Sequence, residues 1–159
     1  MAQIHRLQVQ KELKNCSGDQ LYCFYKNEIA KLPQVLPHIF KSVQILAGDG
    51  NSAGTVRLTK LCIGSSREEI MKDKIETVVD ESRTLRGSII DGDLLRMYPK
   101  FEYTITITPL VTQGEEESCL FKLSVEYEKE NEDVPNPTEY MEMSSFISKA
   151  VASHLAKKA

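Results

Sequence analysis

Asp73 is the charged residue whose position in the sequence most invites a chemical role. It lies between Met71 and Ile75 in a stretch that alternates apolar and polar residues, so in a strand its side chain shares their apolar face. A buried carboxylate is costly unless it is paired with a cation or used in binding or catalysis. We favour a salt bridge to Arg57 or Lys74, and ligand anchoring or acid–base chemistry stays open as the alternative.

Tyr103 and the histidines are the next candidates. Tyr103 combines an apolar ring with a polar tip that suits the orientation of a bound molecule, although a plain core tyrosine is the favoured interpretation. His5, His38 and His154 are spread along the chain with no two at metal-ligand spacing, so we expect neither a metal nor another cofactor. His154 falls on the inner stripe of a predicted helix, where a packing role is favoured.

The sequence gives little support for nucleophilic catalysis or for nucleotide binding. The sequence has no G-x-S-x-G and no persuasive cysteine–histidine pair, which disfavours a hydrolase. The glycine-rich segment 48–54 lacks the Lys-Ser/Thr ending of a P-loop and leads into a strand, so we interpret it as a tight turn. Any catalysis is expected to be proton transfer or cyclisation on a ligand held in a dry pocket.

Composition restricts the class of protein. The chain has 159 residues, 41% apolar and 27% charged, with a net charge of −3, which predicts one ordered domain spanning residues 1–159. It has no block of basic residues, no signal-peptide pattern and no apolar run approaching about 20 residues, so we expect no nucleic-acid partner, no membrane and a cytoplasmic location.

The cysteines are expected to be free thiols. Cys16, Cys23, Cys62 and Cys119 are scattered, without a C-x-x-C motif or a secretory context that would favour disulfides or zinc. We predict a monomer or a weak homodimer in reducing buffer.

The elements that must position these residues are mostly strands. Period-two alternation predicts a strand around Leu7–Leu13, and further strands near 43–45, 55–63, 70–79, 84–90, 101–108 and 120–128. In the stretch 101–108, Phe101, Tyr103, Ile105 and Ile107 alternate with polar residues. Short polar connections such as Asp80–Ser82 favour antiparallel hairpins over crossover helices. We therefore predict a seven-stranded antiparallel sheet.

Helices are expected at two places. Ser17 and Gln20 have the spacing of a capping box, and Pro33 and Pro37 divide the following apolar pattern into a first helix and a very short second one. Asn136 and Pro137 suit the start of a long helix that ends near Lys157. This element order predicts an α+β fold, with a curved sheet wrapped around one long C-terminal helix. Periodicity alone does not decide whether side chains fill the space between them.

Three segments resemble a known family. Residues 126–140 (EYEKENEDVPNPTEY) are similar to the Y-E-K-x-N-E-D-V-P-x-P-x-x-Y segment of major latex proteins, a group within the pathogenesis-related and birch-pollen-allergen (Bet v 1-like, START-like) superfamily. Residues 48–56 resemble the glycine-rich loop of that family, and Asp91–Asp93 resembles its E-G-D turn. A tyrosine frequent on the fifth strand of the allergen branch is replaced here by Leu85 or Gly87, so the ligand chemistry of that branch is not transferred.

The resemblance implies a helix-grip fold with a sizeable hydrophobic cavity. Family members bind hydrophobic or amphipathic plant metabolites, and some are enzymes of specialised metabolism. We therefore expect binding and carriage of a hydrophobic small molecule, in a plant-defence or metabolic setting. The alternative is a cofactor-free isomerase or cyclase of alkaloid or terpenoid metabolism. The inward positions of each element, the presumed mouth and the resemblance together predict the ligand-binding residues Phe24, Tyr25, Leu32, Ile39, Leu61, Asp73, Leu85, Ile89, Tyr103, Ile105, Tyr140, Met143, Ser144 and Ile147.

Overall fold

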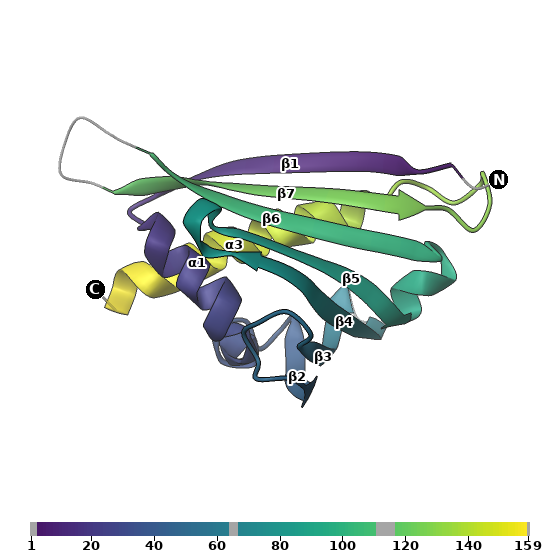
Figure 1. The fold of residues 1–159 in the computed structure, drawn as a ribbon, viewed down its shortest axis with the longest axis horizontal. Helices are drawn as coiled ribbons and strands as arrows, with labels where there is room; N and C mark the ends of the chain where they lie inside the picture. Colours follow the sequence, from purple (N-terminus) through teal and green to yellow (C-terminus); the bar gives the residue numbers. More distant parts are fainter. Residues whose placement is uncertain (1–2, 64–66, 111–116, 159) are drawn as a thin grey trace.

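Seven antiparallel strands form one sheet in the order β1-β7-β6-β5-β4-β3-β2, and a long helix lies beside it (Figure 1). The computed structural model describes residues 3–63, 67–110 and 117–158. The strands are β1 (His5–Lys14), β2 (Phe40–Ala47), β3 (Val56–Ile63), β4 (Arg67–Val79), β5 (Thr84–Gly92), β6 (Lys100–Leu110) and β7 (Ser118–Glu128). The helices are α1 (Gly18–Asn27), α2 (Leu32–Val35) and α3 (Thr138–Lys158), with short 3-10 turns η1 (Ile29–Lys31), η2 (Asp80–Ser82) and η3 (Asp93–Arg96). The predicted α+β architecture is confirmed.

The alternation of residue types along the strands produces one covered face. In β7 the buried Phe121, Leu123, Val125 and Tyr127 alternate with partly exposed polar residues. The neighbouring β6 runs antiparallel in a register that places Tyr103 opposite Val125 and Ile105 opposite Leu123. Because successive side chains of a strand point to opposite faces, this register gathers the apolar side chains on the inner face of the sheet.

The start of α1 follows from its N-cap. The side chain of Ser17 accepts a hydrogen bond from the backbone N–H of Gln20 at 3.3 Å, which satisfies one donor that the helix leaves free. Pro33 lies in the first turn of α2, where its missing N–H costs no helical hydrogen bond. Both short helices were predicted, and together they brace one end of the sheet.

Helix α3 begins at Thr138, one residue after the predicted Pro137. The side-chain oxygen of Asn136 accepts a hydrogen bond from the Tyr127 hydroxyl at 2.6 Å, which ties the start of α3 to β7. The helix also packs against β1 and β3. Within the described ranges, the helices are all too short or too polar to cross a bilayer.

Candidate functional site

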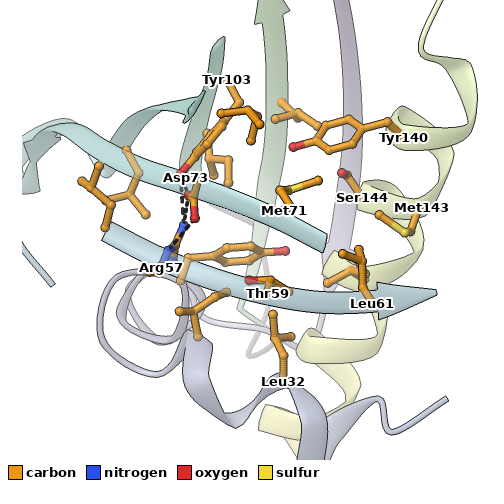
Figure 2. Close-up of a pocket in the computed structure, with 18 of the residues that line it drawn as sticks. Leu32, Arg57, Thr59, Leu61, Met71, Asp73, Tyr103, Tyr140, Met143 and Ser144 are labelled. Carbon is orange, nitrogen blue, oxygen red and sulfur yellow. Dashed lines mark hydrogen bonds and ion pairs between the residues drawn. The ribbon is translucent and has the colours of Figure 1, made fainter. Parts of the chain in front are cut away.

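A pocket of about 130 Å³ lies between the inner face of the sheet and helices α1, α2 and α3 (Figure 2). Strands β2 to β7 form one wall, α3 lies opposite them, and Tyr25 and Leu32 reach the pocket from α1 and α2. Most of the lining side chains are apolar, and a few polar groups stand among them. The pocket is smaller than the sizeable cavity that the family resemblance implied.

Most of the residues predicted to bind a ligand meet at this pocket. Twelve of the fourteen line it: Tyr25, Leu32, Leu61, Asp73, Leu85, Ile89, Tyr103, Ile105, Tyr140, Met143, Ser144 and Ile147. They come from seven different elements, so only the fold brings them together. Their role in binding a ligand stays a prediction.

Phe24 and Ile39 do not line the pocket, so these two placements were wrong. Phe24 and Tyr25 are adjacent in α1 and project about 100° apart around the helix, so they cannot both point the same way. Phe24 is instead 1% exposed in the core, with its ring edge-on to Tyr25 at 6.3 Å. Ile39 sits in the turn before β2, where its carbonyl accepts a hydrogen bond from the Cys62 N–H and its side chain packs against the core.

Other lining residues were missed by the sequence reasoning. The most important is Arg57, which had been considered only as a partner for Asp73. Arg57, Thr59 and Leu61 alternate along β3, so the prediction that Leu61 points inward already placed the other two on the same face. The remaining lining residues that were not predicted are Ile29, Phe40, Met71, Ile75, Arg86, Phe121 and Leu123.

Arg57, Asp73 and Tyr103 form a buried polar cluster in the pocket wall (Figure 2). Arg57 Nη2 donates to Asp73 Oδ2 at 2.6 Å, and Arg57 Nε donates to Asp73 Oδ1 at 3.2 Å. The Tyr103 hydroxyl donates to Asp73 Oδ2 at 2.6 Å and accepts from Arg57 Nη2 at 3.0 Å. Arg57 and Asp73 face each other directly across β3 and β4, so the register itself sets up the pair. Of the two cations considered for Asp73, the structure selects Arg57.

Burial and mutual contact fix the protonation states of this cluster. Burial alone would lower the pKa of Arg57, but Tyr103 and Asp73 outweigh it and raise that pKa above its ordinary value. Burial first, and then the charge of Asp73, hold the pKa of Tyr103 well above its ordinary value. At neutral pH the cluster therefore contains one cation and a neutral phenol, and the hydrogen bonds that Asp73 accepts suit an ionised carboxylate.

Gly87 makes room for Tyr103. The two residues are directly opposite each other on β5 and β6. A Cβ atom at Gly87 would lie 2.3 Å from the Tyr103 hydroxyl oxygen and 2.5 Å from the ring carbon that bears it. The missing side chain thus lets the tyrosine lie across β5 and reach Asp73 on β4, so Gly87 is a positioning residue for the cluster.

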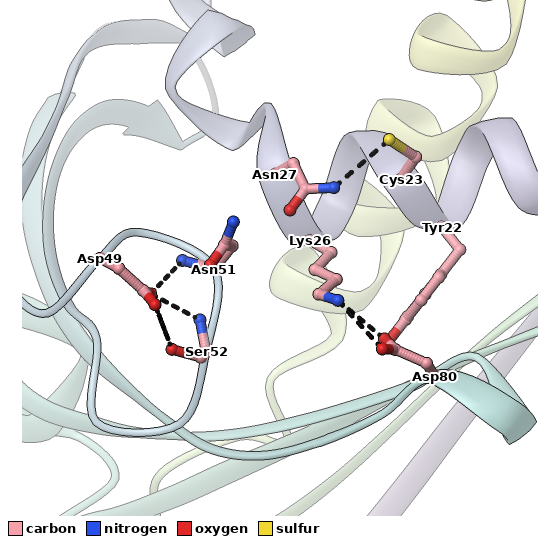
Figure 3. A network of polar contacts seen from close by, with 8 residues as sticks. All are labelled: Tyr22, Cys23, Lys26, Asn27, Asp49, Asn51, Ser52 and Asp80. Carbon is pink, nitrogen blue, oxygen red and sulfur yellow. Dashed lines mark hydrogen bonds and ion pairs between the residues drawn. The ribbon is translucent and has the colours of Figure 1, made fainter.

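Surface charges hold α1 against the sheet. The Tyr22 hydroxyl donates to Asp80 Oδ1 at 2.7 Å, and Lys26 Nζ contacts both oxygens of Asp80, at 2.9 and 3.1 Å (Figure 3). Arg83, whose φ of 51° lies in the left-handed region, donates to Asp19 at 2.7 Å. These contacts fasten α1 to η2 and the residue that follows it, and α1 in turn carries Tyr25 to the pocket.

Comparison with known proteins identifies the family. The family model of the pathogenesis-related protein Bet v 1 family matches residues 5–158. The chain is 34% identical to major latex protein 146 of Papaver somniferum, over 89% of this chain and 85% of the relative. It is 33% identical to MLP-like protein 423 of Arabidopsis thaliana, over 82% and 81% of the two chains. The chain therefore belongs to the Bet v 1 family, and within that family it is similar to the major latex proteins.

Solved structures agree with the fold. The crystal structure of major latex-like protein 151 from Panax ginseng matches with a TM-score of 0.84 and 21% identity, over 95% of this chain and 97% of that one. Norcoclaurine synthase from Thalictrum flavum, solved in complex with dopamine and hydroxybenzaldehyde, matches with a TM-score of 0.71 and 26% identity, over 96% and 89%. The same fold thus occurs in an enzyme.

Proposed function

We propose that this protein binds and carries a hydrophobic or amphipathic small metabolite, acting in the cytosol. The observation that carries the proposal is the pocket under α3, where apolar side chains from the sheet and from helices α1, α2 and α3 surround a few convergent polar groups. That combination is typical of small-molecule sites, in which the apolar wall supplies affinity and the polar groups fix orientation. Membership of the Bet v 1 family and the major latex relatives support it.

The alternative is a cavity enzyme, an isomerase or cyclase that needs no cofactor. The similarity to norcoclaurine synthase and the presence of Asp73 and Tyr103 in the pocket favour it. General acid–base catalysis works best with groups whose pKa lies near the working pH. The raised pKa of Tyr103 and the hydrogen bonds that occupy Asp73 count against proton transfer by either group, so we place the carrier first.

Native mass spectrometry of the protein isolated from its own tissue tests the proposal. A carrier is expected to retain a small molecule as a discrete mass addition, which denaturation releases. The released compound, added back at a roughly hundredfold excess over its dissociation constant, should stabilise the fold by about 2.7 kcal/mol. For a chain of this length that corresponds to a rise of several degrees in melting temperature, at about 2–4 °C per kcal/mol.

The same experiment separates carrier from enzyme. A carried ligand is recovered chemically unchanged after prolonged incubation with the protein, whereas an enzyme converts it to an isomer or cyclised product. Protein that is isolated without any bound small molecule, and whose melting temperature does not respond to apolar compounds of any size, would contradict both functions.

A further inference from the structure

The volume of the pocket limits what it can bury. An engineered cavity of roughly 150 Å³ lined by apolar side chains binds benzene. The pocket here, at about 130 Å³, is of the same order. The part of a ligand that it encloses is therefore about the size of one six-membered ring.

The charges in the pocket wall cancel. Arg57 and Asp73 are paired with each other, their side chains being 12% and 7% exposed, and the raised pKa of Tyr103 keeps it neutral. Arg86 also lines the pocket, but its guanidinium contacts Glu102 at 3.4 Å and its side chain is 48% exposed. An ionised ligand would lose its water on entry and find no net opposite charge, which is unfavourable.

Neutral hydroxyl groups face the same space. Among the described residues, the hydroxyls of Tyr25 and Tyr140 have no hydrogen-bond partner, although both residues line the pocket. Burial is the largest cause that raises the pKa of Tyr140, and the charge of Asp73 adds to it, which places its hydroxyl within reach of the cluster's field. In Figure 2 the hydroxyl end of Tyr140 is directed toward the side where Asp73 and Tyr103 lie.

An uncharged hydroxyl on the ligand fits these groups. It can donate to a carboxylate or phenol oxygen and accept from a guanidinium or tyrosine hydroxyl, without adding charge to the site. We infer that the pocket selects a neutral, single-ring hydroxy compound, such as a phenol, whose oxygen is directed to the cluster of Arg57, Asp73 and Tyr103. This inference rests on the proposed function and adds the ligand's size, charge and polar group.

Four compounds of nearly equal size test the selection: p-cresol, p-xylene, benzoate and benzylamine. At neutral pH benzoate is an anion, benzylamine is a cation and the other two are uncharged. Isothermal titration calorimetry with the full chain should give p-cresol about tenfold or more higher affinity than each of the others, because they leave a polar group or a charge without a partner. Equal binding of benzoate, benzylamine or p-xylene would overturn the inference.

A variant that removes one charge from the cluster tests whether the cluster causes the selectivity. Asp73→Asn leaves the Arg57 cation without a counter-ion, so benzoate should gain about tenfold or more relative to p-cresol. Glu126→Gln is the matched control, since it removes a carboxylate from an exposed contact with Arg6, neither residue lines the pocket, and the order of affinities should not change. A folded Asp73→Asn protein with unchanged selectivity would reject the role of the cluster, and if that variant does not fold, the four affinities of the parent protein still decide.

One further measurement separates this inference from the proposed function. Nile red, a neutral multi-ring dye, is titrated with the same protein. Nile red binding in the absence of p-cresol binding would refute the single-ring inference and leave the proposed function standing. Failure of all five compounds to bind would count against both.

Discussion

The inner face of the sheet has a packed half and an open half, and the two differ in how their tyrosines are used. The packed half is built from Phe101 and Tyr127, against which Tyr98 packs from the segment before β6, and the three ring centroids lie 5.4 to 6.2 Å apart. The open half is the pocket wall that holds the polar cluster of Arg57, Asp73 and Tyr103. Tyr140 lies at the boundary, because its ring packs edge-on against Phe101 at 4.9 Å while it also lines the pocket.

The tyrosine hydroxyls have different hydrogen-bond partners in the two halves. In the packed half the Tyr98 hydroxyl donates to the carbonyl of Pro135 and the Tyr127 hydroxyl to Asn136, both at 2.6 Å. These bonds run to the segment before α3. In the open half the Tyr103 hydroxyl bonds to Arg57 and Asp73 on the neighbouring strands, so its ring lies along the sheet and lines the pocket. The two tyrosines of the packed half thus bond away from the sheet, whereas Tyr103 bonds to its neighbouring strands.

The largest expected effect is loss of the whole fold at alkaline pH. Burial is the largest cause that raises the pKa of all six tyrosines, Tyr22, Tyr25, Tyr98, Tyr103, Tyr127 and Tyr140. Because the folded-state pKa values lie above the unfolded value of about 10, the stability from these neutral phenols is complete below that pH. It is lost as the pH rises above 10 toward the folded-state values.

Phenolate absorbance at increasing pH measures this effect. The native protein should ionise few tyrosines until it unfolds, and then all of them together, whereas the protein in denaturant should follow an ordinary titration curve. An early partial rise that disappears in a Tyr25→Phe/Tyr140→Phe variant would break the comparison, because it would show that the open half is wet.

The next effect compares truncations in the two halves. Phe101 is 1% exposed among other rings, so Phe101→Ala should lower the free energy of unfolding by about 3–5 kcal/mol. Met71→Ala, in the open half, should cost about 2 kcal/mol or less, because one side of Met71 already faces the pocket. Equilibrium unfolding in urea measures both. Equal costs would mean that the open half is as tightly packed as the other.

Gly87→Ala is expected to cost about 1–3 kcal/mol, because the new methyl group overlaps Tyr103 and displaces it from Asp73. Tyr103→Leu removes the overlapping ring, so the additional cost of Gly87→Ala in that background should fall well below its cost alone. A double-mutant cycle by urea unfolding tests this. Additive costs would show that Gly87 does not act through Tyr103.

Filling the open half should change stability least. Met143→Trp places a larger ring in the pocket and should alter the free energy of unfolding by less than about 1 kcal/mol, while removing the thermal shift that a confirmed ligand produces. Phe146→Trp is the matched control, since Phe146 is 57% exposed on the same helix and the ligand shift should persist. If a ligand shifts the Met143→Trp protein as much as the parent, it does not occupy this pocket.

The reactivity of the cysteine thiols compares buried with exposed positions in the native protein. Cys16 and Cys119 are 2% and 0% exposed, whereas Cys23 is exposed and Cys62 is intermediate. A thiol reagent should modify Cys23 at once and Cys62 more slowly, and should reach the other two only on unfolding. The denatured, unreduced protein should give four thiols in total; a count of two or fewer would contradict the prediction of free cysteines.

Strand faces and helix starts could be predicted from the sequence, because they depend on local periodicity and spacing. Alternation placed Tyr103 and Ile105 on the inner face of β6, and the spacing of Ser17 and Gln20 placed the start of α1. It could not choose between Phe24 and Tyr25, since both are apolar and adjacent on a helix whose rotation depends on packing. It also could not reveal the contact of Gly87 with Tyr103, which depends on the β5–β6 register, or the size of the pocket, which depends on side-chain rotamers.

The fastening of α1 has a kinetic consequence. Its contacts with Asp80 and Arg83 involve charges near the surface, with the Asp80 side chain 64% exposed and that of Asp19 77% exposed. Exposed charges are screened over about 8 Å at physiological ionic strength, whereas buried pairs are screened much less. Added salt should therefore loosen the hold on α1 before it affects the pair of Arg57 and Asp73. We expect ligand entry and exit to become faster with ionic strength while the preference among ligands stays the same.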